Sequence, residues 1–184
     1  MESFSFRNAP LNLLSVIITS DRLKLLPISE QFERDIYREF TDEITTYMIP
    51  SPANSVEETN SFIIASRDSM KAGYNLQFVV LSKTTDEFLG NCGLHGKNKV
   101  KTPEIGIWLK KEAHGKAYGR EAVRTLVNWS RKNLDLKYFI YPVDRRNIAS
   151  CKIPESLGGK VIEESEMVNQ KGKTLDCLVY KIEA

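Results

Sequence analysis

The sequence predicts an α+β (mixed α/β) fold, in which helices cover a mixed β-sheet. Short β-rich runs alternate with segments whose apolar residues recur at helical spacing. Single helices separate several of the strands, and this order of elements favours a mixed sheet. The length of 184 residues suits one domain with a sizeable core, so we expect a single domain over residues 1–184.

Each element has its own signal in the sequence. Pro27 and Pro142 end two β-rich runs, and a capping box formed by Ser55 and Glu58 opens a helix. A lead-in over residues 1–20 comes first and could end in a short strand. Strands are predicted over residues 22–28, 76–82, 88–94, 103–109 and 137–143, and near "KVIE" and "LDCLVYKI". Helices are predicted over residues 29–41, from Ser55 to about Gly73, across Ala122 to Trp129, and shortly after Asn147.

Composition argues against two classes of partner. The chain has 26 basic and 24 acidic residues and a net charge of +2, so we expect no nucleic-acid partner. The apolar run Leu11–Ile18 is too short to span a membrane and contains polar residues, so we expect no membrane segment. The expected location is the cytoplasm.

Cysteine and histidine give no pattern for a metal site. Cys92, Cys151 and Cys177 are widely spaced and form no C-x-x-C pair, so neither a zinc site nor a disulfide scaffold is predicted. His95 and His114 are expected on separate loops, with no carboxylate at ligand spacing. The sequence therefore predicts no metal, and it predicts reduced thiols in a cytosolic protein.

The segment "HGKAYGR" has the composition of an anion-binding loop. Gly115, Ala117 and Gly119 are small residues at alternate positions between a predicted strand and a predicted helix. Unpaired N–H groups at the start of a helix attract anions, and Lys116 and Arg120 add positive charge. An ordinary turn ahead of a helix is the alternative interpretation. The segment lacks the ending of a Walker loop and the close glycine pair of a dinucleotide-binding fingerprint.

Three pieces of the sequence together carry a family resemblance: "PEIGIWLKKEAHGKAYGREAV", then "NIAS" at residues 147–150, then "ESLGG" at residues 155–159. They resemble the GNAT superfamily of acetyl-CoA-dependent N-acetyltransferases, and most of all its ribosomal-protein N-terminal acetyltransferase branch. "RLKLLPIS" and "FLGNCGL" extend the resemblance from about Arg22 to the end of the chain. It implies a GNAT-like, mostly antiparallel sheet of about six to seven strands with helices on both faces, and acetyl-CoA as co-substrate.

The resemblance also implies a set of cofactor-binding residues. The family's phosphate signature, Gln/Arg-x-x-Gly-x-Gly/Ala, falls on His114, Ala117 and Gly119, and the family's Asn-x-x-Ser motif falls on "NIAS". The residues expected to contact the cofactor are Ile107, Trp108, Leu109, His114, Gly115, Lys116, Ala117, Tyr118, Gly119, Arg120 and Asn147.

Four positions depart from the family pattern. His114 stands in place of Gln or Arg, and Ala117 in place of the central glycine, where a methyl group is tolerated if φ is negative. Pro154 should kink or shorten the helix that follows Asn147. Gly159 removes the aromatic residue that closes this segment in the family.

Acetyl transfer to an amine needs a neutral nucleophile, donors for the developing oxyanion, and a proton for the departing thiolate. Glu104 is the first candidate for the base, because the family often carries a glutamate at the start of this strand; a structural carboxylate is the alternative. Backbone N–H groups of residues 105–110 would supply the oxyanion donor. Ser150 would protonate the sulfur, with Tyr141 as a rival donor. Asn147 would contact the pantetheine arm, cap the helix, or do both.

The predicted function is an N-acetyltransferase that moves an acetyl group from acetyl-CoA directly to a primary amine in a ternary complex. Cys151 has no paired base in the sequence, so a covalent acyl-enzyme is not expected. A protein N-terminus is one acceptor class, and polyamines, amino acids and aminoglycosides are others. The acidic run at residues 163–166 is a second source of a base. The rival function is a GNAT-like module that binds CoA or acyl-CoA without turnover. A monomer or a homodimer is compatible with the edge strands.

Overall fold

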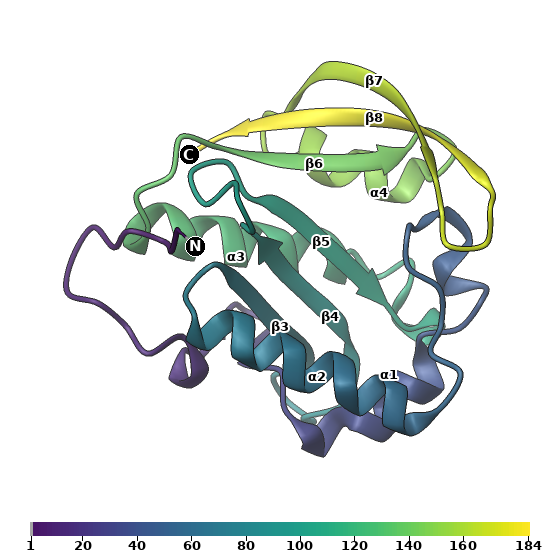
Figure 1. The fold of residues 1–184 in the computed structure, drawn as a ribbon, viewed down its shortest axis with the longest axis horizontal. Coiled ribbons are helices and arrows are strands. Elements are labelled where there is room, and N and C mark those ends of the chain that lie inside the picture. The colour runs from purple at the N-terminus through teal and green to yellow at the C-terminus, as the bar shows by residue number, and fades with distance from the viewer. Residues whose placement is uncertain (1) are drawn as a thin grey trace.

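A computed structural model describes residues 2–184 and contains one eight-stranded sheet (Figure 1). The strands are β1 (Ile18–Thr19), β2 (Leu23–Pro27), β3 (Asn75–Ser82), β4 (Phe88–His95), β5 (Glu104–Leu109), β6 (Tyr138–Asp144), β7 (Lys160–Val168) and β8 (Thr174–Glu183). Their order across the sheet is β1-β2-β3-β4-β5-β6-β8-β7. All neighbouring pairs are antiparallel except β5 and β6. The predicted mixed, mostly antiparallel sheet is confirmed, and its eighth strand is the short β1 at the end of the lead-in.

Helices cover both faces of this sheet, as predicted (Figure 1). They are α1 (Glu33–Glu39), α2 (Val56–Lys71), α3 (Tyr118–Asn133) and α4 (Ile148–Glu155). Helices α1 and α2 contact β4 and β3 on one face, whereas α3 and α4 contact β5, β6 and β8 on the other. The helix predicted over residues 29–41 is shorter than expected, because the 3₁₀ turn Glu30–Phe32 precedes α1.

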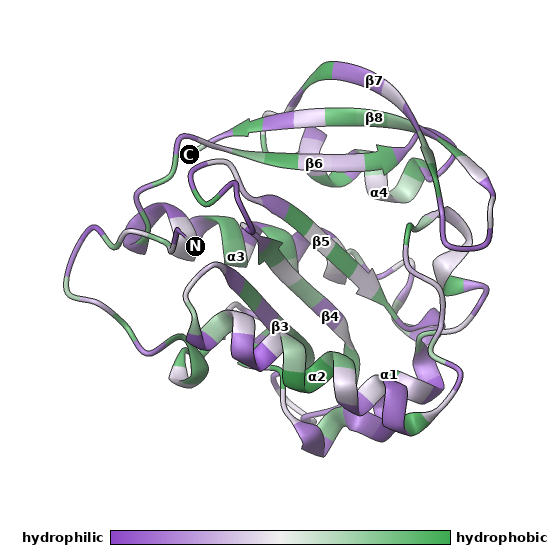
Figure 2. Cartoon of the chain, in the orientation of Figure 1, coloured by the Kyte–Doolittle hydropathy of each residue, from purple (hydrophilic) through white to green (hydrophobic). Residues whose placement is uncertain are grey.

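Helix α3 illustrates how the apolar pattern fixes the core. Ala122, Val123, Leu126 and Val127 are fully buried and lie on one side of the helix, because they are spaced by three or four residues. The hydroxyl of the buried Ser130 donates to the carbonyl of Leu126 at 2.8 Å, so this polar group is satisfied. Apolar residues likewise follow the central strands (Figure 2). Within residues 2–184, none of the helices combines the length and the apolar composition needed to cross a membrane.

The predicted capping box at the start of α2 is half formed. The hydroxyl of Ser55 accepts the backbone N–H of Glu58 at 3.2 Å, as a capping serine should. The Glu58 carboxylate accepts the backbone N–H of Asn54 at 2.7 Å instead of that of Ser55. The helix therefore begins where the sequence predicts, with a different partner for the glutamate.

Strands β5 and β6 diverge in the middle of the sheet. They are in register at one position, where Glu104 lies opposite Ile140, and the N–H of Ile140 donates to the carbonyl of Pro103 at 3.0 Å. Pairing is confined to the start of β5, and the two parallel strands separate toward their C-terminal ends (Figure 1). Residues of both strands line the cavity in this space.

Candidate active site

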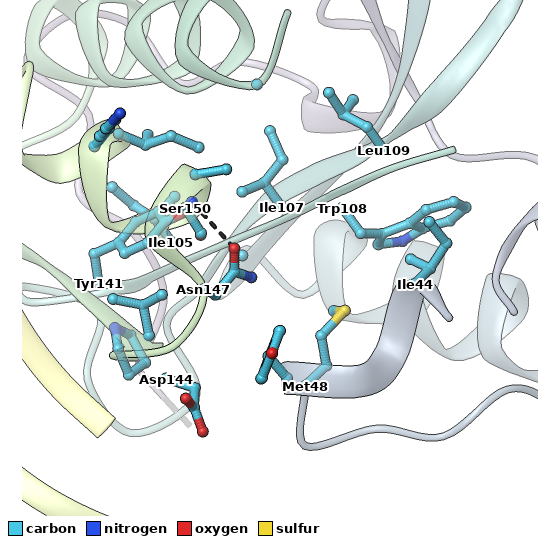
Figure 3. A pocket seen from close by; sticks show the side chains of 18 of the residues that line it. Ile44, Met48, Ile105, Ile107, Trp108, Leu109, Tyr141, Asp144, Asn147 and Ser150 are labelled. Atoms are coloured by element: carbon cyan, nitrogen blue, oxygen red, sulfur yellow. Dashed lines mark hydrogen bonds between the residues drawn. The ribbon is translucent and has the colours of Figure 1, made fainter. Parts of the chain in front are cut away.

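A cavity of about 900 Å³ lies where β5 and β6 diverge, and residues from both faces of the sheet line it (Figure 3). Alternate residues of β5 point to opposite faces. Ile107 and Leu109 point toward α3, because a Cβ atom on Gly119 would lie 3.8 and 3.6 Å from their Cδ1 atoms. Trp108 points toward the face of α1, where its ring centroid is 4.8 Å from that of Phe40. Two of the three predicted cofactor residues on β5, Ile107 and Leu109, therefore face α3. The third, Trp108, has its side chain in an aromatic cluster on the opposite face.

The loop before α3 presents a row of unpaired backbone N–H groups. Among the residues that the structure describes, the N–H groups of residues 115–120 donate to no protein acceptor. Gly115 and Ala117 have φ values of +75° and +60°, which turn the chain sharply into the helix. The helix dipole adds partial positive charge at the same place. This arrangement can bind a phosphate or pyrophosphate group.

Ala117 does not meet the condition of a negative φ, under which its methyl group would be tolerated. At φ +60° and ψ 14° the residue is left-handed, and this costs a residue with a Cβ atom about 1–2 kcal/mol. The methyl group is therefore accommodated by a strained backbone. The glycine that the family signature has at this position is the sequence signal for a left-handed residue.

Arg22 holds the same loop and was missed by sequence reasoning. Its Nη1 donates to the carbonyl of Lys116 at 3.1 Å, and its Nη2 lies 2.6 Å from the carboxylate of Glu121. Its guanidinium also lies over the ring of Tyr118, 4.7 Å from the centroid. The hydroxyl of Ser20 donates to Glu121 at 2.6 Å. Contacts between residues about a hundred positions apart leave no pattern in the sequence.

The polar side chains of the loop differ in their placement. His114 is exposed, and its Nε2 lies 2.9 Å from the carbonyl of Leu109, so the ring folds back onto the end of β5. The side chains of Lys116 and Arg120 are exposed, and Arg120 lines the cavity. Both cations are available to a bound anion.

The first turn of α4 brings three predicted residues together. The Oδ1 of Asn147 accepts the N–H of Ser150 at 3.2 Å, so this asparagine caps the helix while its side chain lies within the cavity (Figure 3). The hydroxyls of Ser150 and Tyr141 are hydrogen-bonded at 2.8 Å. Burial raises the pKa of Tyr141 well above its usual value, so its hydroxyl stays protonated at neutral pH. The two rival donors of the sequence analysis are thus direct partners.

Glu104 and His95 line the cavity on the face of α1 and α2. Glu104 shares this face with Gly106 and Trp108, as the alternation of β5 predicts. His95 is the last residue of β4, so its predicted position on a loop is wrong. Burial raises the pKa of Glu104, with a smaller opposing effect of Lys99, and burial lowers the pKa of His95. Both shifts arise because desolvation disfavours the charged form.

Asp144, at the end of β6, is a fully buried carboxylate on the cavity wall. It accepts the Nε of Arg146 at 2.8 Å and the N–H groups of Arg146 and Asp176 at 2.9 and 3.2 Å. The hydrogen bond from Arg146 lowers the pKa of Asp144 below its usual value. This carboxylate ties the start of α4 to β8, and sequence reasoning did not single it out.

Two segments meet across the cavity, and together we call them the hairpin bridge: residues 42–51 and the hairpin tip at residues 169–173. The N–H of Gln170 donates to the carbonyl of Ile49 at 3.0 Å, and its Oε1 accepts the N–H of Ser51 at 2.8 Å. Lys171 forms an ion pair with Asp42. The cavity lining includes Ile44 and Met48, on the opposite side from Tyr141 and Ser150 (Figure 3).

The two departures near α4 have structural reasons. Pro154 lies in the last turn, and α4 ends at Glu155, so the helix is short, as predicted. A Cβ atom on Gly159 would lie 2.8 Å from the carbonyl oxygen of Pro154, which leaves no space for a side chain.

All three cysteines are buried and free. In the described part of the chain, no three His, Cys, Asp or Glu side chains are grouped for metal binding.

Comparisons with known proteins agree with this geometry. Residues 22–160 match the family described as "Acetyltransferase (GNAT) domain". An uncharacterized N-acetyltransferase p20 from Bacillus licheniformis is 27% identical over 144 residues, covering 76% of this chain and 80% of that protein.

Solved structures share the fold at low identity. A RimL ribosomal L7/L12 alpha-N-protein acetyltransferase in complex with coenzyme A has a TM-score of 0.80 and 18% identity, covering 91% of this chain and 98% of that chain. The Microcin C7 self immunity acetyltransferase MccE, in complex with acetyl-CoA and AMP, has a TM-score of 0.77 and 20% identity, covering 90% of this chain and 94% of that chain. The match over most of its length shows that the chain belongs to the GNAT acetyltransferase domain family, which confirms the prediction of an acetyl-CoA-dependent N-acetyltransferase.

Proposed function

We propose that this protein transfers the acetyl group of acetyl-CoA directly to a primary amine in a ternary complex. The observation that carries the proposal is the row of unpaired N–H groups at residues 115–120, which opens onto the same cavity as Ser150. This row fits a pyrophosphate, and the apolar side chains of Ile107 and Ile153 fit a pantetheine arm. Acetyl-CoA would bind on the face of α3 and α4, and the amine on the face of α1 and α2.

The remaining residues have roles that follow from their positions. Glu104 supplies negative charge on the amine's side of the sheet, and its raised pKa suits a group that accepts a proton near neutral pH. On the other side, Ser150 donates a proton to the thiolate and takes one from Tyr141, its hydrogen-bond partner at 2.8 Å, and Tyr141 regains its proton from solvent in the cavity. Burial raises the pKa of Cys151, so its thiol is protonated and a poor nucleophile, which supports direct transfer.

The first acceptor class to test is a protein N-terminus, because the similar RimL structures carry this activity in their names. Small amines form the second class, because MccE is a self immunity acetyltransferase solved with AMP. The three free, buried thiols support a location in the reducing cytoplasm.

Release of free thiol from acetyl-CoA, measured with a panel of peptides with free N-termini and of small amines, tests turnover. We expect release with at least one amine; CoA binding without any thiol release would support the rival non-catalytic module.

Calorimetry tests the loop: Gly119→Glu should weaken acetyl-CoA binding at least tenfold by placing charge and bulk in the anion site. Asn128→Glu adds the same charge to an exposed position of α3 and should leave the affinity for acetyl-CoA unchanged. Equal acetyl-CoA affinity of the Gly119→Glu protein and the wild type would show that this loop does not bind the pyrophosphate.

A further inference from the structure

His95 and Glu104 lie directly opposite each other on neighbouring antiparallel strands. They are Cα partners in the register of β4 and β5, so their side chains project from the same face of the sheet. Both side chains line the cavity and are exposed toward it. Directly opposed residues have Cβ atoms about 5 Å apart, which lets an imidazole and a carboxylate act on one small group between them.

The imidazole of His95 lies against Gly106, which has no side chain. A Cβ atom at residue 106 would lie 2.7 Å from the Nε2 of His95 and 3.3 Å from its Cδ2. The ring therefore lies across the backbone of β5, with its Nε2 edge in the space where any other residue would have a side chain. Gly106 itself lines the cavity, so this edge of the ring is on the cavity wall.

Neither ionisable side chain is committed to another residue. Among residues 2–184, no hydrogen bond or ion pair joins His95 or Glu104 to a protein group, and Lys99 acts on Glu104 as a more distant charge. Strand β3 faces His95 with Asn75, which does not titrate. Across the cavity, Asp144 is bound to Arg146, and burial raises the pKa of Cys177, so that thiol stays protonated.

We propose that His95 is a second catalytic residue, which forms a proton-accepting pair with Glu104 for the acceptor amine. The Glu104 carboxylate attracts the ammonium form of the acceptor. An N–H bond of the ammonium breaks, its electron pair stays on the amine nitrogen, and the proton forms a new bond to Nε2 of His95. The Glu104 carboxylate stabilises the resulting imidazolium until the proton leaves to water. This inference rests on the proposed amine acetylation and names the groups that make the amine nucleophilic.

Burial raises the pKa of Glu104 and lowers the pKa of His95. The lowered pKa of His95 favours the neutral imidazole at neutral pH, as a proton acceptor requires.

Proton NMR tests the pair without any turnover. The chain has two histidines, so a single His114→Gln protein assigns both imidazole resonances. We expect His95 to titrate below its ordinary value, and Glu104→Gln to lower its pKa further, since the carboxylate no longer stabilises the imidazolium. An unchanged His95 titration in the Glu104→Gln protein would overturn the pairing.

Kinetics test the catalytic role with the amine found in the thiol-release panel. We expect His95→Gln to lower kcat about 10- to 100-fold and to displace the acidic limb of the pH–rate profile, with acetyl-CoA affinity unchanged. Gly106→Ala should reproduce the loss while keeping both ionisable groups, because its Cβ displaces the ring. Lys97→Gln, at an exposed position in the neighbouring loop, is the matched control and should keep the wild-type profile.

The outcomes separate the two proposals. Thiol release by wild type together with an unchanged profile in the His95→Gln protein would refute the role of His95 and leave the acetyltransferase function standing. No thiol release with any amine would count against the function, whereas the NMR titration would still decide whether the pair exists.

Discussion

Ala117 stands where the chain turns from the cofactor loop into α3, and it carries a local conflict between side chain and backbone. Its φ of +60° is a conformation that glycine adopts without cost, and the family signature has glycine at this position. The conflict leaves the fold intact because Arg22 binds the neighbouring carbonyl of Lys116 and α3 is firmly packed. Part of the protein's stability is therefore used to hold the cofactor loop in shape.

Replacing Ala117 by glycine should stabilise the protein. The change removes about 1–2 kcal/mol of backbone strain, whereas the greater freedom of glycine in the unfolded chain offsets about 0.4–1 kcal/mol of it. We expect the free energy of unfolding, measured with urea, to rise by up to about 1.5 kcal/mol. Ala65→Gly, at an exposed position inside α2, should instead lower it by about 1 kcal/mol. A loss of stability in both variants would mean that Ala117 is not strained.

The contact between Ser150 and Tyr141 shows what sequence reasoning can and cannot give at this scale. Each residue was identified separately, one from a motif and one from its strand, and they were ranked as rivals. Their hydrogen bond at 2.8 Å depends on how α4 packs on β6, which neither residue's neighbours in the sequence reveal. The same holds for His95 and Glu104: alternation along the strand gives the face of Glu104, but His95 is expected on a loop, and the sequence does not indicate the register that places the two residues opposite each other.

The Ser150 and Tyr141 hydroxyls should behave kinetically as one unit. Ser150→Ala and Tyr141→Phe should each lower kcat about tenfold, with little change in the Kd for acetyl-CoA, because each interrupts proton delivery to the thiolate. The double variant should be no slower than the slower single variant. Single-turnover rates measure all three. Losses that multiply in the double variant would show two independent contributions, contrary to a relay.

At the scale of elements, periodicity and capping signals located nearly every helix and strand, because these signals are local. The failures occur where tertiary contacts decide. The short strand expected at the end of the lead-in is β1, but its two residues are too few to show a period, and its bounds are set by the pairing of Ile18 and Thr19 with β2. Residues 30–32 form a 3₁₀ turn instead of the first turn of α1. The junction of β6 and α4 is likewise fixed by Asp144, a buried carboxylate that binds three segments.

Asp144→Asn should destabilise the protein near neutral pH by about 2 kcal/mol, because charge-assisted hydrogen bonds to Arg146 are lost. The folded-state pKa of Asp144 is depressed, chiefly by Arg146, so its contribution is complete above the unfolded pKa of about 3.9 and is lost as the pH falls toward the folded pKa. Urea unfolding at several pH values measures this difference. The gap between wild type and variant should narrow as the pH falls below the unfolded pKa, and a gap that stays constant there would rule out the charge as its cause.

At the scale of the whole molecule, the sheet separates two approaches to one cavity. The α3 and α4 side offers backbone donors and a hydroxyl pair, and the opposite side offers Glu104, His95 and the hairpin bridge. The bridge joins residues 42–51 to the hairpin tip at residues 169–173, two segments that lie far apart in the sequence. Amine binding should therefore depend on the hairpin, whereas acetyl-CoA binding should not.

Gln170→Ala tests this division, because Gln170 joins the hairpin tip to residues 49–51 through both its backbone and its side chain. Loss of the side-chain bond should speed hydrogen exchange of the Ser51 amide about fivefold, the equivalent of about 1 kcal/mol. The KM for the amine should rise severalfold, since the bridge wall is looser, while calorimetry should find acetyl-CoA affinity unchanged. Asp86→Asn removes an exposed ion pair with Lys24 in a distant turn and should change neither quantity. Faster exchange at Ser51 without any change in the KM for the amine would show that the bridge is only a structural contact and takes no part in acceptor binding.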